Sequence, residues 1–373
     1  MFWASLIGAS YSYFIYPIIL CILPRRKPQT QPAGSTLPFV SIIVTVFNEE
    51  SKIADKIRNT LELDYPPQKL EFIVASDAST DATHEIVRGF KDEGVQLIVS
   101  SSRRGKEFAQ SIAIEVARGD IFVFSDAATR LPADGLGKMV QAFEDVGVGA
   151  VACEDKLISR DGEFSPEGVY LKYEMWLRRL ETRVNTLIGL NGTFFGARSQ
   201  VCQQWKTDIQ SDFNTALNAI REGYVAVSDP EVKCFYLDIE DSRREYDRKF
   251  RTVLRGCSVL AASLDLLNPL AYPFASFQLW SHRVARYLVP WFLMALVIAN
   301  LFLLQIHSVY RITFGIQCAF YAIAALGMGV RQFRSFSTVK IIVFFVSSNI
   351  AVGHATLAFL LGKRVIAWQP SKR

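Results

Sequence analysis

The stretch Phe39-Val-Ser-Ile-Ile-Val-Thr-Val46, followed at once by Phe47-Asn-Glu-Glu50, decides the fold class. Its first part is an almost unbroken apolar run rich in β-branched residues. Such a run is typical of a strand that is buried on both faces of a parallel sheet. The polar and acidic residues that follow then lie at the carboxyl end of this strand, where open α/β sheets bind their ligands.

The alternation of strand and helix patterns continues along the chain. Because successive βα units build parallel sheets, the sequence predicts an α/β, Rossmann-like fold with a mostly parallel sheet. Polar residues also follow the second and fourth predicted strands, in Ser76-Asp77 and Ser125-Asp126. The predicted strands are 39–46, 71–76, 95–100 and 121–125, and the predicted helices are 50–63, 80–91 and 105–118.

Three strand ends in a row are therefore acidic or polar, and the sequence contains neither GxGxxG nor GxxxxGK[ST]. A carboxylate-lined site can read the base and ribose of a nucleotide directly. It reaches the phosphates through a divalent cation, because bare aspartate and phosphate repel each other. Asp77 or Asp81 alone is more often a helix N-cap, and that alternative stays open for each. Three such strand ends together are hard to explain as caps.

The composition points to a protein that combines a globular domain with membrane helices. Half of the residues are hydrophobic (50%), 21% are charged, and the mean hydropathy is +0.19. Four runs without charge are each long enough to cross a bilayer core of about 30 Å. The six cysteines form no CxxC pair, so we expect neither a zinc site nor a disulfide framework. The uncharged runs are 2–23, 287–306, 312–330 and 341–362.

The positions of the charges predict the topology. No Asp or Glu occurs before residue 25 or after residue 286, and Arg25-Arg-Lys27 and the Arg283/Arg286 pair flank the middle domain. By the positive-inside rule this domain is cytosolic, in a multi-pass protein of the inner (plasma) membrane. Basic residues beside apolar runs fit a lipid bilayer, and no nucleic acid is expected as a partner.

The last uncharged run conflicts with this topology, because it would carry the basic tail to the outer side. Either the tail is an exception, or the run is re-entrant or broken near Asn349 and His354. Pro269 and Pro273 interrupt the apolar stretch before the second run and predict interfacial helices there. The expected parts are a membrane helix (1–24), a cytosolic domain (25–256), interfacial helices (257–286) and a C-terminal membrane region (287–373).

Four segments, in this order, carry a resemblance to a known family: Phe47-Asn-Glu-Glu50, Ser76–Thr83, Arg104-Gly-Lys106 and Asp126-Ala-Ala-Thr129. They resemble the signatures of membrane-bound family 2 glycosyltransferases with a GT-A fold, the group of the cellulose, chitin, hyaluronan and poly-N-acetylglucosamine synthases. Each motif alone is weak, but their order and spacing are specific. The similarity covers roughly residues 38–260. Asn191–Arg198, Ser211-Asp-Phe213 and the tail Trp368–Arg373 also resemble segments of this group.

The resemblance implies an inverting transfer from a nucleoside-diphosphate sugar, with uridine diphosphate as the expected nucleotide, to an acceptor hydroxyl. It implies that Asp212 is the catalytic base, that Asn191 and Gly192 contact the acceptor, and that Asp126 holds Mg²⁺ or Mn²⁺. The acceptor would be a polysaccharide or a lipid-linked sugar, and a homo-oligomer is left open. The residues implied to bind the nucleotide sugar are Thr45, Phe47, Glu49, Asp77, Lys106, Asp126, Arg248 and Arg251.

Several of these residues have a plainer interpretation. Asp212 could be the N-cap of a helix that spans 213–222, and Lys106 could belong to a helix surface. Arg248 and Arg251 suit a diphosphate clamp, since guanidinium forks fit phosphate oxygens. We expect Lys249 and Arg255, on the same predicted helix, to form a solvated or headgroup-contacting basic face.

Two departures from the family pattern change the expected chemistry. Ala128 stands where the metal motif has Asp or Asn, so we expect Asp126 and the diphosphate to hold the metal, with Glu154 as a candidate helper. Lys249 stands where processive synthases have a tryptophan that stacks on the acceptor sugar. We therefore expect one or a few sugars per encounter. A polyprenyl-phosphate sugar synthase and a catalytically degenerate scaffold subunit remain as alternatives.

Overall fold

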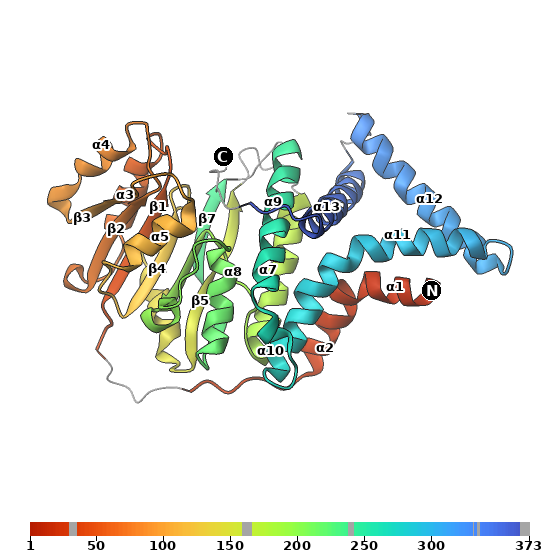
Figure 1. Ribbon diagram of the computed structural model, residues 1–373, viewed down its shortest axis with the longest axis horizontal. Coiled ribbons are helices and arrows are strands. Elements are labelled where there is room, and N and C mark those ends of the chain that lie inside the picture. Colours follow the sequence, from red (N-terminus) through yellow and green to blue (C-terminus); the bar gives the residue numbers. More distant parts are fainter. Residues whose placement is uncertain (30–35, 159–165, 238–241, 331, 334–335, 366–373) are drawn as a thin grey trace.

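The computed structural model describes residues 1–29, 36–158, 166–237, 242–330, 332–333 and 336–365. The Trp368–Arg373 tail singled out in the sequence lies outside the described residues. A sheet domain occupies one end of the molecule and apolar helices the other, with α7 and α9 between them (Figure 1). The two upright helices are α7 (Pro166–Val184) and α9 (Ser242–Ala261).

The sheet has seven strands in the order β3-β2-β1-β4-β6-β5-β7. β1 pairs in parallel with β2 and with β4, and β2 pairs in parallel with β3. β6 runs antiparallel to both β4 and β5, while β5 and β7 are parallel. The strands are β1 (Val40–Val46), β2 (Leu70–Ser76), β3 (Val95–Val99), β4 (Ile121–Asp126), β5 (Val148–Ile158), β6 (Phe194–Arg198) and β7 (Val225–Leu237).

Alternating side chains of β1 serve two cores. Val40, Ile42, Val44 and Val46 pack with residues of α3, α4 and α6, whereas Ile43 packs on the opposite face with residues of α5 and α8. Helices thus cover both faces, which explains why β1 is apolar throughout. These helices are α3 (Ile53–Leu61), α4 (Thr83–Arg88), α5 (Lys106–Ile114), α6 (Gly135–Gln141) and α8 (Ser211–Arg221). The 3₁₀ turns are η2 (Pro67–Lys69), η3 (Lys91–Glu93), η4 (Ala142–Glu144), η5 (Ser199–Cys202) and η6 (Leu264–Leu267).

The strands and helices of the first half match the predicted βα units, and the expectation of a mostly parallel α/β domain is confirmed. The observed helices are shorter at both ends than the predicted ones. The expected helix over 80–91 is α4 (Thr83–Arg88), because Asp81 Oδ1 accepts the backbone N–H of Thr83 at 3.0 Å at its start. The N-cap position of α4 is Ala82, however, so Asp81 lies one residue before it, and the plainer interpretation of Asp81 as the cap residue does not hold.

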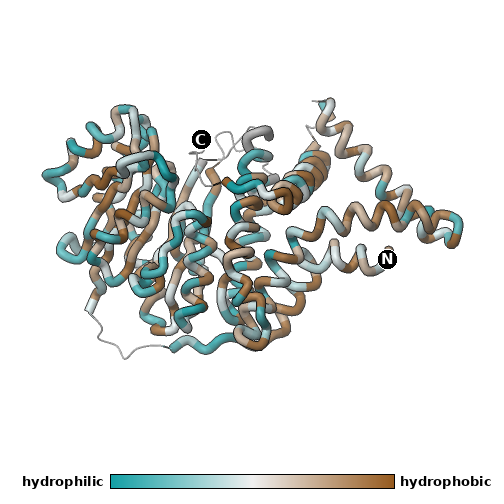
Figure 2. Tube along the Cα trace, viewed as in Figure 1, coloured by the Kyte–Doolittle hydropathy of each residue, from teal (hydrophilic) through white to brown (hydrophobic). Residues whose placement is uncertain are grey.

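Within the described residues, four helices are long and apolar enough to cross a membrane: Phe2–Ile22, Pro273–Leu303, Ser308–Gly329 and Ser337–Leu360. Figure 2 shows the hydrophobic colouring along these helices, away from the sheet. Large apolar side chains remain exposed on them, such as Phe302 at 79% and Leu360 at 76%. Their elements are α1 (Phe2–Ser10), η1 (Tyr11–Ile15), α2 (Tyr16–Ile22), α10 (Pro273–Gln278), η7 (Leu279–Val284), α11 (Ala285–Leu303), α12 (Ser308–Gly329) and α13 (Ser337–Leu360).

Two details of the predicted membrane region are different. Pro273 does not interrupt a helix: it is the first residue of α10, a position that tolerates proline, and the helix continues through the π-helical η7 into α11. α13 is unbroken, so the expectation of a broken last run is wrong. The Asn349 side chain donates to the Phe345 carbonyl oxygen of its own helix at 2.9 Å, and this bond satisfies the amide without a break.

Candidate active site

The loops that follow β1 and β2 are fastened to each other. Asn48 and Ala78 both have a positive φ, of 52° and 56°. For alanine this backbone conformation is strained, and such strain tends to cluster at functional sites. Asn48 N–H donates to Ser79 Oγ at 3.0 Å, and Thr80 N–H donates to Asn48 Oδ1 at 2.8 Å. The two strand ends therefore form one rigid edge.

Asp77 is fully buried at this edge and holds the loop that precedes α5. Its two carboxylate oxygens accept the backbone N–H groups of Arg104 at 2.8 Å and Gly105 at 2.9 Å. Gly105 has φ +104°, a conformation that favours glycine. Asp77 thus positions the first residue of α5, Lys106, at the edge of the sheet.

Lys106 links Asp126, on the side of the site expected to bind the nucleotide sugar, to Gly192, on the side expected to bind the sugar acceptor. Its Nζ donates to Asp126 Oδ1 at 2.6 Å and to the carbonyl oxygen of Gly192 at 3.0 Å. Lys106 is only 7% exposed. Burial lowers the pKa of Lys106, but the charge of Asp126 and its hydrogen bond outweigh this, so the pKa is raised. Lys106 is therefore a charged group inside the site and not part of a helix surface.

Asp212 lies next to Gly192, inside α8. A Cβ atom on Gly192 would lie 2.8 Å from Asp212 Oδ2, so only glycine leaves room at that point. Asp212 Oδ1 accepts its neighbour Phe213 N–H at 2.8 Å, and Oδ2 accepts Gln210 Nε2 at 3.0 Å. The N-cap position of α8 is Gln210, so the plainer interpretation of Asp212 as the cap residue does not hold.

Burial raises the pKa of Asp212, and the positive charges of Lys106 and Arg255 only partly offset this effect. Asp212 is 8% exposed. A carboxylate that is poorly solvated and has a raised pKa is a stronger base than a free aspartate, because its charged form gains by taking up a proton. The position has the chemistry of a general base.

The segment around Asn191 is held from behind. Arg178 Nη1 on α7 donates to Asn191 Oδ1, and Asn191 Nδ2 donates to the Cys153 carbonyl oxygen at 3.0 Å. The backbone N–H of Leu190 donates to the Asp212 carbonyl oxygen at 3.2 Å. Since its amide is fully engaged, Asn191 shapes the segment, and the Gly192 backbone is the part that faces Asp212 and Lys106.

The other residues predicted to bind the nucleotide sugar lie at or near the same edge of the sheet, and each has its own surroundings. The Arg103 guanidinium lies 3.8 Å from the ring centre of Phe47. Glu49 is 3.5 Å from Lys52 Nζ, and burial raises the Glu49 pKa. Thr45 Oγ1 is buried without a hydrogen-bond partner among the described residues.

The structure does not bring Arg248 and Arg251 to Asp126. Arg248 forms an ion pair with Glu167 on α7, and Arg251 Nε donates to the Asp247 carbonyl oxygen of its own helix. Their expected role as a diphosphate clamp stays a prediction. Arg255, expected on a headgroup-contacting face, instead pairs with Glu107 on α5 and influences Asp212.

Sequence reasoning missed Arg255, Arg178 and Gln210 as neighbours of the site. The spacing of Arg248, Arg251 and Arg255 placed them together on α9, but spacing cannot say which one faces α5. Arg178 lies in the middle of α7, without any motif around it.

Asp126 is the predicted metal ligand whose surroundings suit a cation bound to a substrate diphosphate. Its side chain is 29% exposed, and Lys106 engages Oδ1, the one carboxylate oxygen with a side-chain partner among the described residues. Mg²⁺ commonly uses one or two carboxylates together with substrate phosphates. Glu154 is not a helper at this point, since it pairs with Lys156 at 2.6 Å and with Arg179 at 2.5 Å.

A second group could also hold a metal ion. Cys153, Asp155 and Cys234 place one ligand atom each within 4.8 Å of one another. The Asp155 carboxylate already accepts the Thr193 hydroxyl at 2.7 Å, and the two sulfur atoms are 2.7 Å apart. The expectation of no zinc site from sequence rested on motif spacing, which does not detect residues on neighbouring strands.

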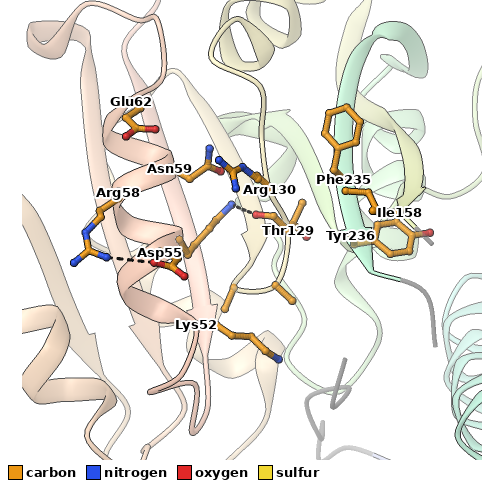
Figure 3. Close-up of a pocket in the computed structure, with 13 residues that line it drawn as sticks. Lys52, Asp55, Arg58, Asn59, Glu62, Thr129, Arg130, Ile158, Phe235 and Tyr236 are labelled. Atoms are coloured by element: carbon orange, nitrogen blue, oxygen red, sulfur yellow. Dashed lines mark hydrogen bonds and ion pairs between the residues drawn. The ribbon is translucent and has the colours of Figure 1, made fainter. Parts of the chain in front are cut away.

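An open pocket of about 620 Å³ borders the turn that contains Ala128. Side chains of α3 form one wall, and Phe235 and Tyr236 of β7 form the other, with the Thr129–Arg130 segment between them (Figure 3). Lys56, at the back of this wall, donates to Ser125 Oγ at 2.7 Å and to the Thr129 carbonyl oxygen at 2.8 Å. It therefore anchors both sides of Asp126.

Comparison with known proteins identifies the sheet domain. Residues 41–197 match the model of glycosyl transferase family 2. This range contains the ends of β1, β2 and β4 but not Asp212. Residues 41–197 are thus similar to a family 2 glycosyltransferase domain, and the resemblance seen in the sequence is confirmed.

Two curated relatives share the domain. The β-monoglucosyldiacylglycerol synthase of Trichormus variabilis is 27% identical over 221 residues, which cover 56% of this chain and 47% of that protein. The poly-β-1,6-N-acetyl-D-glucosamine synthase of Staphylococcus aureus is 25% identical over 263 residues, which cover 68% and 62%. The chain thus spans about half the length of the first relative and less than two thirds of the second.

A solved structure shares the fold over nearly the whole chain. The mannosyltransferase PcManGT from Pyrobaculum calidifontis, in complex with GDP-Man and Mn²⁺, superposes with a TM-score of 0.74 at 23% identity and covers 97% of this chain and 98% of that one. The predicted GT-A fold with flanking apolar helices is confirmed.

Proposed function

We propose that this protein is an inverting glycosyltransferase that moves a sugar from a nucleoside-diphosphate sugar to an acceptor hydroxyl at the membrane. One observation supports this above all: Lys106 Nζ joins Asp126 to the Gly192 carbonyl oxygen, and Gly192 lies against Asp212. A donor-side carboxylate and a candidate base are thus linked through one side chain. A single displacement needs a group that holds the leaving diphosphate and a base for the attacking hydroxyl, and Asp126 and Asp212 would supply these two groups in one site.

In the proposed reaction, the acceptor hydroxyl attacks the anomeric carbon of the donor sugar and gives its proton to Asp212. The bond between that carbon and the diphosphate oxygen breaks, and the electron pair leaves with the nucleoside diphosphate. The raised pKa of Asp212 favours the proton transfer. Lys106 carries its positive charge between Asp126 and the acceptor segment, where it can stabilise negative charge that develops on the leaving group.

Asp126 would hold the divalent cation, Mg²⁺ or Mn²⁺, together with the donor diphosphate. When bound, the ion would neutralise charge on the departing phosphates. The partly exposed Asp126 carboxylate, whose Oδ2 has no partner within the described ranges, supports this assignment, as does the Mn²⁺ in the mannosyltransferase complex. Asp77 and the Asn48 loop would shape the nucleotide pocket, since their hydrogen bonds fix the two strand ends.

The acceptor is proposed to be lipid-linked or a preformed oligosaccharide, and the product a glycolipid or polysaccharide. The two curated relatives, named for the synthesis of a glycolipid and of a polysaccharide, support this range. Lys249 supports short products: its Nζ lies 4.5 Å from the Tyr170 ring centre and offers no flat face for a sliding polymer. We place the sheet domain on the cytosolic side of the inner membrane, because basic residues flank it.

The test is a screen of radiolabelled UDP- and GDP-sugars with membranes that contain the full chain, followed by sizing of the products. We expect release of a nucleoside diphosphate with one donor, coupled to label in short products even at large acceptor excess. Long polymer beside unused acceptor at early times would contradict short transfer. Absence of turnover with every donor would favour a scaffold subunit.

A further inference from the structure

Four basic side chains gather where the sheet domain meets the membrane helices, and we name them the junction cluster: Arg178, Lys249, Arg283 and Arg286. They come from α7, α9, η7 and α11. Tyr170 of α7 connects them. Arg286 Nη1 donates to its hydroxyl at 3.1 Å, Lys249 Nζ lies 4.5 Å from its ring centre, and Arg178 and Arg283 are within electrostatic range of it.

One carboxylate of the cluster is shared by three basic side chains. Glu174 lies 2.8 Å from Arg286, 3.8 Å from Arg178 and 3.2 Å from His282. Glu181 accepts the Tyr16 hydroxyl and His282 Nδ1. Glu167, which pairs with Arg248, and Glu245 lie near enough to act on the charge of Lys249.

Lys249 and Arg283 contact aromatic rings instead. Lys249 faces Tyr170 and Phe344, and Arg283 lies 4.7 Å from the ring centre of Phe213. Neither has a carboxylate within ion-pair distance in the part of the chain that the structure describes. Burial, together with the neighbouring Arg248, lowers the pKa of Lys249 to about 8.

Several donors of the cluster are buried without an acceptor. Arg286, 8% exposed, has no hydrogen-bond partner among the described residues for Nε and Nη2. Arg178, also 8% exposed, has none for Nε, which lies 3.8 Å from Glu174. The buried Nε of Arg283 likewise has no partner within the described ranges. Buried donors normally find acceptors, because leaving them unpaired is costly. An anion with several oxygens would satisfy guanidinium forks and balance the charge at once.

The walls of the cluster indicate where such an anion comes from. Phe344 belongs to α13 and Tyr13 to η1, both within candidate membrane spans, and Arg286 lies 5.3 Å from the Tyr13 ring centre. One side of the cluster is thus built from helices that are long and apolar enough to cross a membrane. A ligand that is charged at one end and hydrocarbon at the other fits this position.

The cluster also contacts the acceptor side of the site directly. Arg283 covers Phe213, the neighbour of Asp212, and Arg178 holds Asn191 next to Gly192. We propose that the junction cluster binds the phosphate group of a membrane lipid that carries the acceptor, with Arg283 and Lys249 as its principal partners. This rests on the proposed function and names its acceptor class. The lipid phosphate does not react, and the acceptor hydroxyl still transfers its proton to Asp212.

Binding can be measured without transfer. Equilibrium dialysis of the full chain in phosphatidylcholine nanodiscs, corrected with empty discs, would use radiolabelled farnesyl phosphate, farnesol and inorganic phosphate as probes. We expect farnesyl phosphate to bind at least tenfold more tightly than either other probe. Equal binding of inorganic phosphate would overturn the lipid source, and equal binding of farnesol would overturn the anion site.

Arg283→Gln and Lys249→Gln should each weaken farnesyl phosphate binding about ten- to hundredfold, the range for losing one charge-assisted contact. Arg283→Lys keeps the positive charge but not the two-pronged guanidinium group. Its affinity for farnesyl phosphate should lie between those of the unaltered protein and Arg283→Gln. Lys172→Gln, an exposed position on α7, is the matched control and should bind like the unaltered protein. Unchanged binding in both Arg283→Gln and Lys249→Gln would overturn the proposal.

Two further readouts keep the outcomes apart. Nucleotide-sugar binding by the same preparations reports whether the sheet domain is folded. If Arg283→Gln no longer binds the nucleotide sugar, farnesyl phosphate binding by Lys249→Gln and Arg283→Lys tests the proposal instead. Failure of the proposed function would appear as no nucleotide-sugar turnover in the unaltered protein. Failure of the lipid-phosphate site would leave turnover intact and probe binding equal in all variants.

Discussion

The strand ends of the sheet and the junction cluster carry opposite charges: the first are lined by carboxylates and the second by basic side chains. At the strand ends, Asp77 accepts two backbone N–H groups and Asp126 accepts a hydrogen bond from Lys106. The carboxylates there already have hydrogen-bond donors from the protein itself. At the junction, Arg283 and Lys249 are left facing aromatic rings. The difference shows what each region can bind: the first accepts phosphates only with added cations, and the second needs an anion from its ligand.

Asp212 lies between the two regions, and its replacement should have the largest effect. Asp212→Asn keeps the shape and the bond from Phe213 N–H but removes the basicity. We expect transfer to fall by roughly two to four orders of magnitude, the range for a positioned base. Donor binding should be retained. Near-full turnover by this variant would show that the two regions do not meet at Asp212.

Removal of divalent cations tests the acidic region. We expect EDTA-treated protein to lose transfer by about a hundredfold or more, because the ion supplies several kcal/mol of charge stabilisation. Mg²⁺ or Mn²⁺ should restore it. Turnover at the untreated rate would mean that Lys106 alone offsets the charge of Asp126 and the diphosphate.

Gly192→Ala tests how tightly the two regions adjoin. The added Cβ would lie 2.8 Å from Asp212 Oδ2 and displace the base. We expect about a ten- to hundredfold loss of transfer, in line with small misplacements of catalytic groups. Gly315→Ala is the matched control, since a Cβ there would meet nothing within 4 Å. Equal rates for the two variants would contradict the geometry at Gly192.

The smallest expected effect concerns Lys56, behind the turn that carries Asp126. Burial lowers its pKa from 10.5 to about 7, so between these pH values the folded state binds fewer protons than the unfolded state. The free energy of unfolding should therefore rise with pH in this window, by at most about 1.4 kcal/mol per pH unit from this group. Lys56→Met should lower stability overall and flatten that rise.

Chemical unfolding of the sheet domain from pH 7 to 9, followed by tryptophan fluorescence, measures the effect. Lys172→Met, at an exposed position, should keep the pH dependence of the unaltered protein. The same slope in Lys56→Met as in the control would show that Lys56 is not held uncharged behind the Asp126 turn.

The sheet region was predictable from sequence because its signals are local. A buried strand is visible as an apolar run, and the residues that follow it must lie at the sheet edge. The expectation for Lys106 was evenly divided, since the first turn of a helix can face either the site or solvent. The hydrogen bonds of Lys106 to Asp126 and to the Gly192 carbonyl oxygen, both distant in sequence, show that Lys106 faces inward.

The junction was not predictable for the opposite reason. Its members come from three separate helices, α7, α9 and the continuous helix that contains η7 and α11, and none of them lies in a recognisable motif. Lys249 and Arg255 are close on one helix, yet Lys249 faces Tyr170 whereas Arg255 faces Glu107. Side-chain direction around a helix decides this, and it depends on tertiary packing that no short motif encodes.

The anomeric configuration of the transferred sugar tests the central claim most directly. Asp212 as a base beside the acceptor segment allows one displacement at the anomeric carbon. NMR of the product formed from an α-linked nucleotide sugar should therefore show a β-glycosidic bond. A product with retained configuration would require two displacements and a covalent or internal nucleophile, and it would contradict the assignment of Asp212 as the general base.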